Sequence, residues 1–206
     1  MICFPNCKIN LGLRIKEKRP DGYHNIETIL FPVFLADALE IIVSQDRSLA
    51  FSVTGLNIPG DKQQNLCLRA YHLMYEKYEI LPVKIHLHKS IPMGSGLGGG
   101  SSNAAFTIKL LNDLFGLKLT TEQMRNLASE IGSDCAYFIE NIPLFAYGKG
   151  DEFQKVKFSL KNFYIVIVKT PINIDTATAY ANITPSNHKY PVKEIVQLPV
   201  QKWKKY

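Results

Sequence analysis

The chain has 206 residues, 46% of them hydrophobic and 20% charged, which is the balance of a globular protein with a sizeable core. The net charge of +6 is a mild surplus that favours anionic ligands such as nucleotide phosphates. The longest apolar stretch, residues 29–43, is interrupted by Pro32, Asp37 and Glu40, which argues against a membrane span, and no secretory signal is recognisable, so a cytoplasmic protein is expected.

Alternating apolar residues predict strands in the first half of the chain. In residues 7–15 the apolar positions alternate with polar ones, so Lys8 and Asn10 are expected on one face of a half-buried strand. Arg-Pro-Asp-Gly at residues 19–22 has the composition of a turn. Further strands are predicted at residues 26–34, 39–43, 49–54 and 83–88.

Helical patterns dominate the middle of the chain. Asn65 is placed to cap a helix that runs to about Tyr78, and residues 101–115 read as a second helix closed by Gly116. A third helix, opened by a capping box of Thr120 and Gln123, is expected to end at Gly132. A late buried strand is predicted at residues 163–169. Because strands precede helices instead of alternating strictly with them, the fold class is α+β.

The four cysteines and the histidines give little sign of a metal site. Cys3, Cys7, Cys67 and Cys135 lack the C-x-x-C spacing, so reduced and mostly buried thiols are expected. His86 and His88 share a strand face, but no third ligand is visible nearby, and surface histidines are the better interpretation.

The segment from Pro92 to Asn103 is the strongest chemical signal in the sequence. Five of the seven residues from 94 to 100 are glycine, and they stand between a predicted strand and a predicted helix. Glycines let the backbone approach an anion closely, and the first N–H groups of a helix point at it with the helix dipole behind them. The pattern therefore predicts a phosphate cradle; a flexible linker is the alternative, although linkers rarely lead straight into a well-patterned helix.

Two other phosphate loops fit less well. A P-loop ends in Gly-Lys-Ser/Thr, and no lysine stands at that point here. Gly94, Gly96 and Gly99 satisfy G-x-G-x-x-G, but a Rossmann unit needs a second strand ending in an acid about 20 residues later. A helical pattern occupies that stretch, so a Rossmann unit remains a minor alternative.

The loop from Pro92 to Ala104 resembles that of the GHMP kinases, Pro-x-Gly-x-Gly-Leu-Gly-x-Ser-Ser-x-Ala. Three further segments resemble motifs of the family members that act on a cytidine-diphosphate-linked methylerythritol. They are Cys-Lys-Ile-Asn-Leu at residues 7–11, Arg-Pro-Asp-Gly-Tyr-His at residues 19–24 and Gly-Ser-Asp at residues 132–134. The resemblance implies an N-terminal domain of the ribosomal-protein-like left-handed βαβ type.

The resemblance also implies a reaction, cofactors and partners. The γ-phosphoryl group of ATP would pass to the 2-hydroxyl of the methylerythritol substrate in the non-mevalonate route to isoprenoids. Mg²⁺ is expected to accompany ATP and bridge its phosphates; its protein ligands are left open, with Ser102 at the helix start as a candidate contact. Monomers or weak homodimers are expected, without nucleic acid or membrane partners. The ATP-binding residues implied are Asn65, Lys89, Pro92, Met93, Gly94, Ser95, Gly96, Leu97, Gly98, Gly99, Gly100, Ser101 and Ser102.

The implied catalytic residues are Lys8 and Asp134, with Asp134 as the base that takes the hydroxyl proton and Lys8 as its electrostatic partner. Each has a plainer interpretation: Asp134 as an N-cap for residues 135–139, and Lys8 as a solvated surface charge. Whether Asp134 removes the proton or Lys8 mainly polarises the hydroxyl stays open.

The implied substrate-binding residues are Asn10, Tyr23, His24 and Tyr180. Tyr23 and Tyr180 would lie on the two faces of the cytosine ring, and His24 would hydrogen-bond to its edge. Tyr23 and His24 alternatively close a loop, and Tyr180 alternatively packs a helix. Likewise, Asn65 also serves as a helix cap and Lys89 as a strand-end cation.

The predicted domains are residues 1–160, which bind ATP and carry the catalysis, and residues 161–206, the start of a shortened C-terminal domain. In the family that domain is ferredoxin-like, and here it is expected to be largely missing. Two alternatives to a working kinase follow: a catalytically impaired remnant that still binds nucleotide, and a basic RNA-binding domain. The sequence does not show the interleaved stripe of basic and aromatic residues that an RNA-binding domain would have.

Overall fold

A computed structural model describes residues 1–170 and 190–206. The chain forms two compact units that interleave along the sequence: residues 1–7 with 33–141, and residues 8–32 with 142–206. The expected mixture of strands and helices, an α+β fold, is confirmed. The sequence-based domain boundary at residue 160 stays a prediction.

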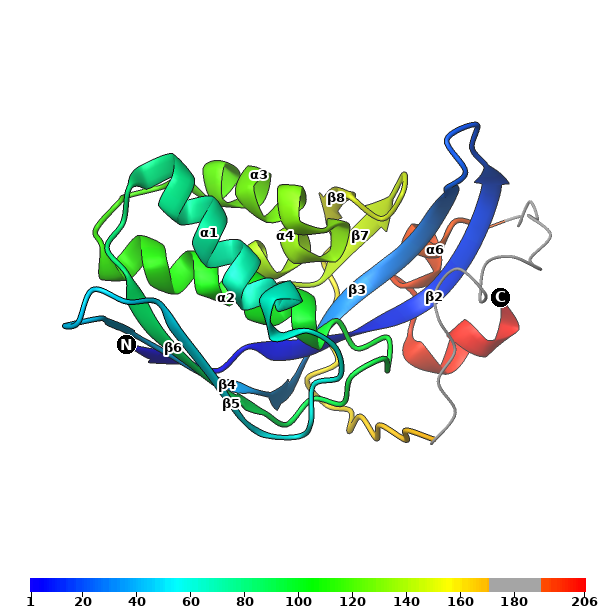
Figure 1. The fold of residues 1–206 in the computed structure, drawn as a ribbon. Helices are drawn as coiled ribbons and strands as arrows, with labels where there is room; N and C mark the ends of the chain where they lie inside the picture. Colours follow the sequence, from blue (N-terminus) through cyan, green and yellow to red (C-terminus); the bar gives the residue numbers. More distant parts are fainter. Residues whose placement is uncertain (171–189) are drawn as a thin grey trace. The chain divides into compact units, whose positions relative to one another are not determined.

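The first unit is built on a four-stranded sheet with the order β1-β4-β6-β5 (Figure 1). Its strands are β1 (Ile2–Cys3), β4 (Ala38–Val43), β5 (Ala50–Gly55) and β6 (Val83–Lys89). β4 pairs antiparallel with β1 and β6, whereas β5 and β6 are parallel and are separated in sequence by helix α1 (Leu66–Tyr78). Parallel neighbours need such a crossover, because a short turn cannot return the chain to the same end of the sheet.

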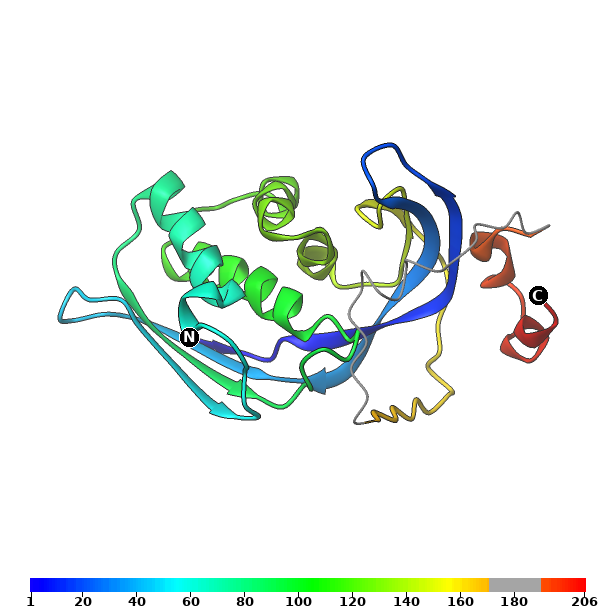
Figure 2. The ribbon, with the colours of Figure 1, turned by 45° about the vertical axis from the view of Figure 1, so that its right-hand side comes forward.

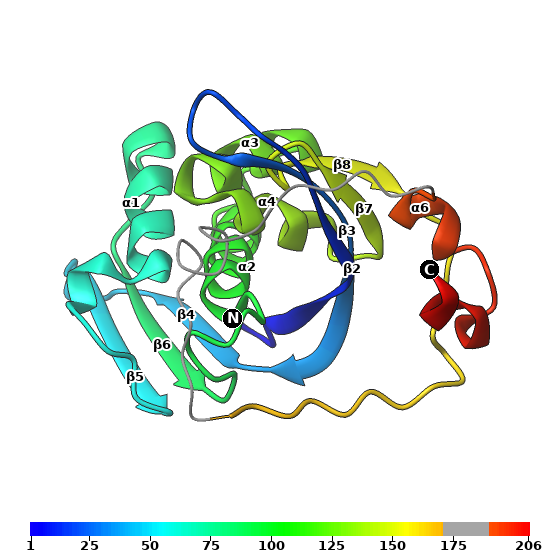
Figure 3. The same cartoon turned by 90° about the vertical axis from the view of Figure 1, so that its right-hand side faces the viewer.

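Helices cover one face of this sheet. They are α1, α2 (Gly99–Leu114), α3 (Thr121–Ile131) and α4 (Ser133–Glu140), with the single turn η1 (Lys62–Gln64) before α1. Figures 2 and 3 show α1 and α2 side by side over the sheet, and α2 also packs against α4. Along β6, Val83, Ile85 and Leu87 are buried, as the alternation predicts, while the residues between them face the other way.

Capping contacts confirm the predicted starts of α1 and α3. The Asn65 side chain accepts a hydrogen bond of 2.9 Å from the Cys67 N–H at the start of α1. Thr120 and Gln123 form the expected capping box before α3, and Gly132 follows its last residue. Helix α2 begins at Gly99, two residues earlier than predicted, so the last glycines of the loop form its first turn.

The second unit contains a sheet with the order β2-β3-β7-β8. Its strands are β2 (Asn6–Lys18), β3 (His24–Ala36), β7 (Leu144–Tyr147) and β8 (Glu152–Lys155), followed by α6 (Val192–Ile195) and η2 (Val200–Lys205). β7 pairs antiparallel with β3 and with β8. Ile29 and Phe145 from the sheet pack with Val192 and Val196 into a small core.

The strand predicted at residues 163–169 is wrong. This segment is irregular, and the side chains of Tyr164, Val166 and Val168 are almost fully exposed. An apolar run forms a strand only where a neighbour supplies the hydrogen bonds of a ladder, and no strand among residues 1–170 and 190–206 pairs with this segment.

The cysteines and histidines behave largely as expected. All four thiols are free; Cys7, Cys67 and Cys135 are buried, and Cys3 is half-buried. His86 hydrogen-bonds to Ser52 and Thr54, and His88 to Thr54, on the face of the sheet opposite the buried strand residues. Within the described residues, no three His, Cys, Asp or Glu side chains gather as a metal site would require, and no helix is long and apolar enough to span a membrane.

Candidate active site

The glycine loop has the backbone of an anion cradle. Gly94, Gly96 and Gly98 have φ angles of 63°, 72° and 69°, a region that residues with a side chain rarely adopt. The Ser95 hydroxyl donates a 2.7 Å hydrogen bond to the Pro92 carbonyl and closes the loop on itself. Gly98 caps α2 without a side-chain hydrogen bond, so no side chain of the cap competes for the first N–H groups. These N–H groups are available to a phosphate.

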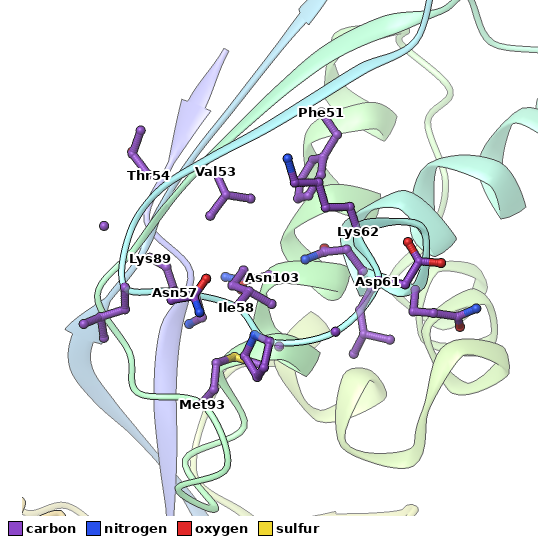
Figure 4. Close-up of a pocket in the computed structure, with 18 residues that line it drawn as sticks. Phe51, Val53, Thr54, Asn57, Ile58, Asp61, Lys62, Lys89, Met93 and Asn103 are labelled. Atoms are coloured by element: carbon purple, nitrogen blue, oxygen red, sulfur yellow. The ribbon is translucent and has the colours of Figure 1, made fainter.

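A cavity of about 540 Å³ adjoins this loop (Figure 4). Its wall comes from β5, the segment between β5 and α1, the end of β6, the glycine loop, and the first turns of α1 and α2. The lining residues are Phe51, Val53, Thr54, Gly55, Leu56, Asn57, Ile58, Pro59, Gly60, Asp61, Lys62, Gln64, Asn65, Leu66, Lys89, Met93, Gly100 and Asn103. An apolar pocket with a few polar groups, next to a phosphate cradle, has the form of a nucleotide site.

Asn65 and Lys89, both predicted from the sequence, line this cavity. Asn65 also caps α1, so its two interpretations are compatible. Lys89 is not a solvated strand-end cation: its side chain is fully buried and its Nζ lies 2.5 Å from the Asp37 carboxylate. The structure thus shows where both side chains lie, while their contact with a nucleotide stays a prediction.

Sequence reasoning missed most of the cavity wall. Phe51, Val53 and residues 56–64 were not identified, although Pro59-Gly60 marked a loop there. Asp37 and Asn103 were also missed as a pair, yet the Asn103 Nδ2 donates a 2.8 Å hydrogen bond to Asp37. A signal was available in Asp37, one of the two acids that interrupt the apolar stretch of residues 29–43.

Two neighbouring glycines in the first turn of α2 provide a matched test of the packing. A Cβ on Gly99 would lie 2.8 Å from Ile91 Cγ2 and 3.0 Å from Lys89 Nζ, whereas a Cβ on Gly100 would meet only Leu66 Cδ1, at 3.6 Å. Gly99→Ala is therefore expected to lower the free energy of unfolding by about 1–3 kcal/mol through overpacking. Gly100→Ala should leave it unchanged or raise it by up to ~1 kcal/mol. Chemical denaturation of both variants checks this, and equal effects would contradict it.

Asp134 lies in the first turn of α4 and is half-buried. The alternative of Asp134 as an N-cap is wrong, because Gly132 is the cap and the helix already begins at Ser133. Beside it, burial raises the pKa of the Cys135 thiol to about 11, so this thiol is neutral near pH 7. Helices α2 and α4 pack against each other within the first unit.

Lys8 and Asn10 share a strand face in the second unit, as the alternation predicted. The Lys8 Nζ donates a 2.7 Å hydrogen bond to Asn10 Oδ1, and Asn10 Nδ2 donates to Thr28 Oγ1 at 3.2 Å. Lys8 is buried, so it is not a solvated surface charge. A buried ammonium held by an amide is well placed for electrostatic work, because its desolvation strengthens its interactions with nearby charge.

Tyr23 and His24 follow the predicted turn. Gly22 has a φ of 83° and its N–H donates to the Arg19 carbonyl at 3.1 Å, while Asp21 Oδ1 accepts from the Tyr23 N–H. Tyr23 is exposed, with Lys149 Nζ 5.3 Å from its ring centroid, so it does not close the loop against a core. His24 begins β3. Tyr180 lies outside the described residues.

Ser102 has a buried hydroxyl without a hydrogen-bond partner. Such groups are rare in folded proteins unless a ligand or water satisfies them, so this oxygen fits an incoming phosphate or its Mg²⁺. The described residues provide no cluster of acids that would hold a metal by itself.

Comparison with known proteins agrees with this geometry. Residues 65–149 match the model of the GHMP kinases N terminal domain. The chain is 49% identical to the 4-diphosphocytidyl-2-C-methyl-D-erythritol kinases of Parabacteroides distasonis and Bacteroides thetaiotaomicron, over 99% of its own length and 74% and 75% of theirs.

Solved structures show the same fold. A crystal structure of 4-(cytidine 5'-diphospho)-2C-methyl-D-erythritol kinase superposes with a TM-score of 0.67 at 32% identity, over 77% of this chain and 56% of that one. A mevalonate kinase superposes with a TM-score of 0.60 at 20% identity, over 76% of this chain and 56% of that one, and shows the fold alone.

The phosphate loop, the adjoining cavity and the α+β fold define the class of the GHMP kinases. Within that class, the chain belongs to the 4-diphosphocytidyl-2-C-methyl-D-erythritol kinase family. It spans about three quarters of the length of the curated relatives it matches.

Proposed function

We propose that this chain is an ATP-dependent kinase that phosphorylates the 2-hydroxyl of 4-(cytidine 5'-diphospho)-2-C-methyl-D-erythritol, in the non-mevalonate route to isoprenoid precursors. The observation that carries the proposal is the continuity of the glycine loop with the cavity through Met93 and Gly100. Such a pairing of cradle and pocket suits a nucleotide, and the names of the relatives support the choice of acceptor.

The cavity would hold the adenine, with Asn65 and Lys89 in its wall. The loop from Pro92 to Ser102 would hold the phosphates through backbone N–H groups, since phosphoryl transfer needs mainly positioning and neutralised charge. Mg²⁺ bound with ATP would supply further positive charge, with Ser102 as a protein contact.

On the acceptor side, Asp134 would accept the proton of the 2-hydroxyl while that oxygen forms a bond to the γ-phosphorus. The bond from the γ-phosphorus to the bridging oxygen breaks at the same time, and ADP leaves. Lys8 would stabilise the developing negative charge, and Asn10 would position the substrate. Tyr23 and His24 would bind the cytosine, joined by Tyr180.

The acting form is proposed to be a cytoplasmic monomer or weak homodimer without nucleic-acid or membrane partners. The test is to incubate the chain with Mg²⁺, ATP and the cytidyl-methylerythritol substrate, and to follow ADP together with the phosphorylated product. Product formation that depends on the substrate supports the kinase.

Tight ADP binding without product would contradict turnover and favour a nucleotide-binding form of the family. RNA binding that falls steeply with salt and ignores ATP would instead favour a basic RNA-binding domain.

A further inference from the structure

Asp37 is the single residue between β3 and β4, and it is fully buried. Its carboxylate accepts four hydrogen bonds. Oδ1 accepts from the backbone N–H groups of Ser90 at 2.7 Å and Ile91 at 2.8 Å. Oδ2 accepts from Lys89 Nζ at 2.5 Å and from Asn103 Nδ2 at 2.8 Å. Its own backbone N–H donates to the Pro5 carbonyl, so the residue is fixed on both sides.

The four donors flank the glycine loop. Ser90 and Ile91 are the two residues immediately before Pro92, where the loop begins. Asn103 lies at the other end of the loop, in α2, one turn after the helix begins at Gly99. Lys89 ends β6, and its ammonium lies beside Gly99, the first residue of α2. One carboxylate therefore holds both ends of the loop.

The buried Asp37–Lys89 pair holds its partners in place because every hydrogen bond around the carboxylate offsets the cost of burying charge. A buried carboxylate and a buried ammonium are tolerated only where they pair and their remaining hydrogen-bonding positions are filled, as they are here. The Lys89 side chain reaches from the cavity wall to Asp37, and the first turn of α2 packs against it. Loss of the carboxylate would leave the ammonium and the Asn103 amide as donors that face each other.

We propose that Asp37 is a positioning residue for the phosphates of the nucleotide: it acts through Ser90, Ile91, Lys89 and Asn103 to hold the glycine loop in its anion-binding form. The proposal rests on the proposed nucleotide binding. Asp37 is not among the cavity-lining residues, so its effect passes through the loop. It should therefore govern affinity for phosphates more than affinity for the base.

The test compares ADP and adenosine as ligands, because only ADP uses the phosphate cradle. In Asp37→Asn, the dissociation constant for ADP is expected to rise by about tenfold to a hundredfold, while that for adenosine changes by less than about threefold. If the unchanged chain turns over, the KM for ATP should rise while the KM for the cytidyl substrate stays the same. Titration calorimetry and initial rates give these values.

Asp46→Asn is the matched control. Asp46 pairs at 2.9 Å with Lys84, which lies in β6 like Lys89. Both side chains are exposed, and neither residue is among those that line the cavity. Its removal should leave the ratio of ADP to adenosine affinity unchanged.

If Asp37→Asn does not fold, the double variant Asp37→Asn with Lys89→Met is used for the same comparison of ADP and adenosine. It removes both buried charges together. Any contact that Lys89 makes with the base would be lost for ADP and adenosine alike. The ratio of the two affinities therefore still measures the binding of the phosphates. A folded variant with an unchanged ratio overturns the positioning role. Failure of the unchanged chain to bind ADP instead overturns the proposed nucleotide function.

Discussion

Asp134→Asn is expected to lower the rate of phosphoryl transfer by about 10²- to 10⁴-fold, the usual contribution of a general base. The amide cannot accept the hydroxyl proton, yet it has the shape of the carboxylate, so the start of α4 should stay intact. The interaction of the carboxylate with the helix dipole costs about 0.3–1 kcal/mol when it is lost, which is too little to unfold the chain.

The measurement is kcat at saturating ATP and substrate, together with an ADP titration to show that nucleotide binding persists. Glu140→Gln is the control, because Glu140 is a carboxylate of the same helix that pairs with Arg125 at 3.4 Å. It should keep the full rate. Undiminished turnover in Asp134→Asn would remove Asp134 from the role of base and leave polarisation by Lys8 as the explanation.

Lys8→Met should also lower kcat, by about 10²-fold or more, because it removes a buried positive charge but keeps much of the volume of the side chain. The KM for ATP should change little if Lys8 acts on the acceptor. The partner Asn10 retains its hydrogen bond to Thr28, so the strand should keep its local order.

Lys16→Met serves as the control for this variant. Lys16 is on the same strand as Lys8 but is partly exposed and pairs with Glu27 at 3.6 Å. In the double variant Lys8→Met with Asp134→Asn, the two losses should be far from additive if both residues serve one chemical step. Additive losses would contradict a shared step.

Local signals account for most of the elements that were predicted correctly. The capping box of Thr120 and Gln123 is a contact between residues three apart, so the sequence contains it entirely. The same holds for the glycine loop, whose positive φ angles follow from the residue type at Gly94, Gly96 and Gly98. The alternation that placed Lys8 and Asn10 on one face is likewise local.

The errors have two different causes, one distant in the sequence and one local. Residues 163–169 have the continuous apolar run of a buried strand, but a strand exists only with a neighbour to bond with. Asp134 looked like a cap because an acid before an apolar run suits that role, whereas the preceding Gly132 takes it in the structure. The substrate contacts of Tyr23 and His24 stay predictions, because local sequence does not specify what an exposed side chain binds.

The sequence by itself determined that this chain has an anion-binding loop, an α+β fold and the motifs of a GHMP kinase, because each depends on residues close together in the chain. Only the tertiary structure decided how the loop is held. Asp37 and Asn103 are 66 residues apart, and their hydrogen bond exists because the sheet and α2 pack together. Pairing over such distances depends on the whole fold, since the chemistry of one carboxylate does not reveal which donors will surround it.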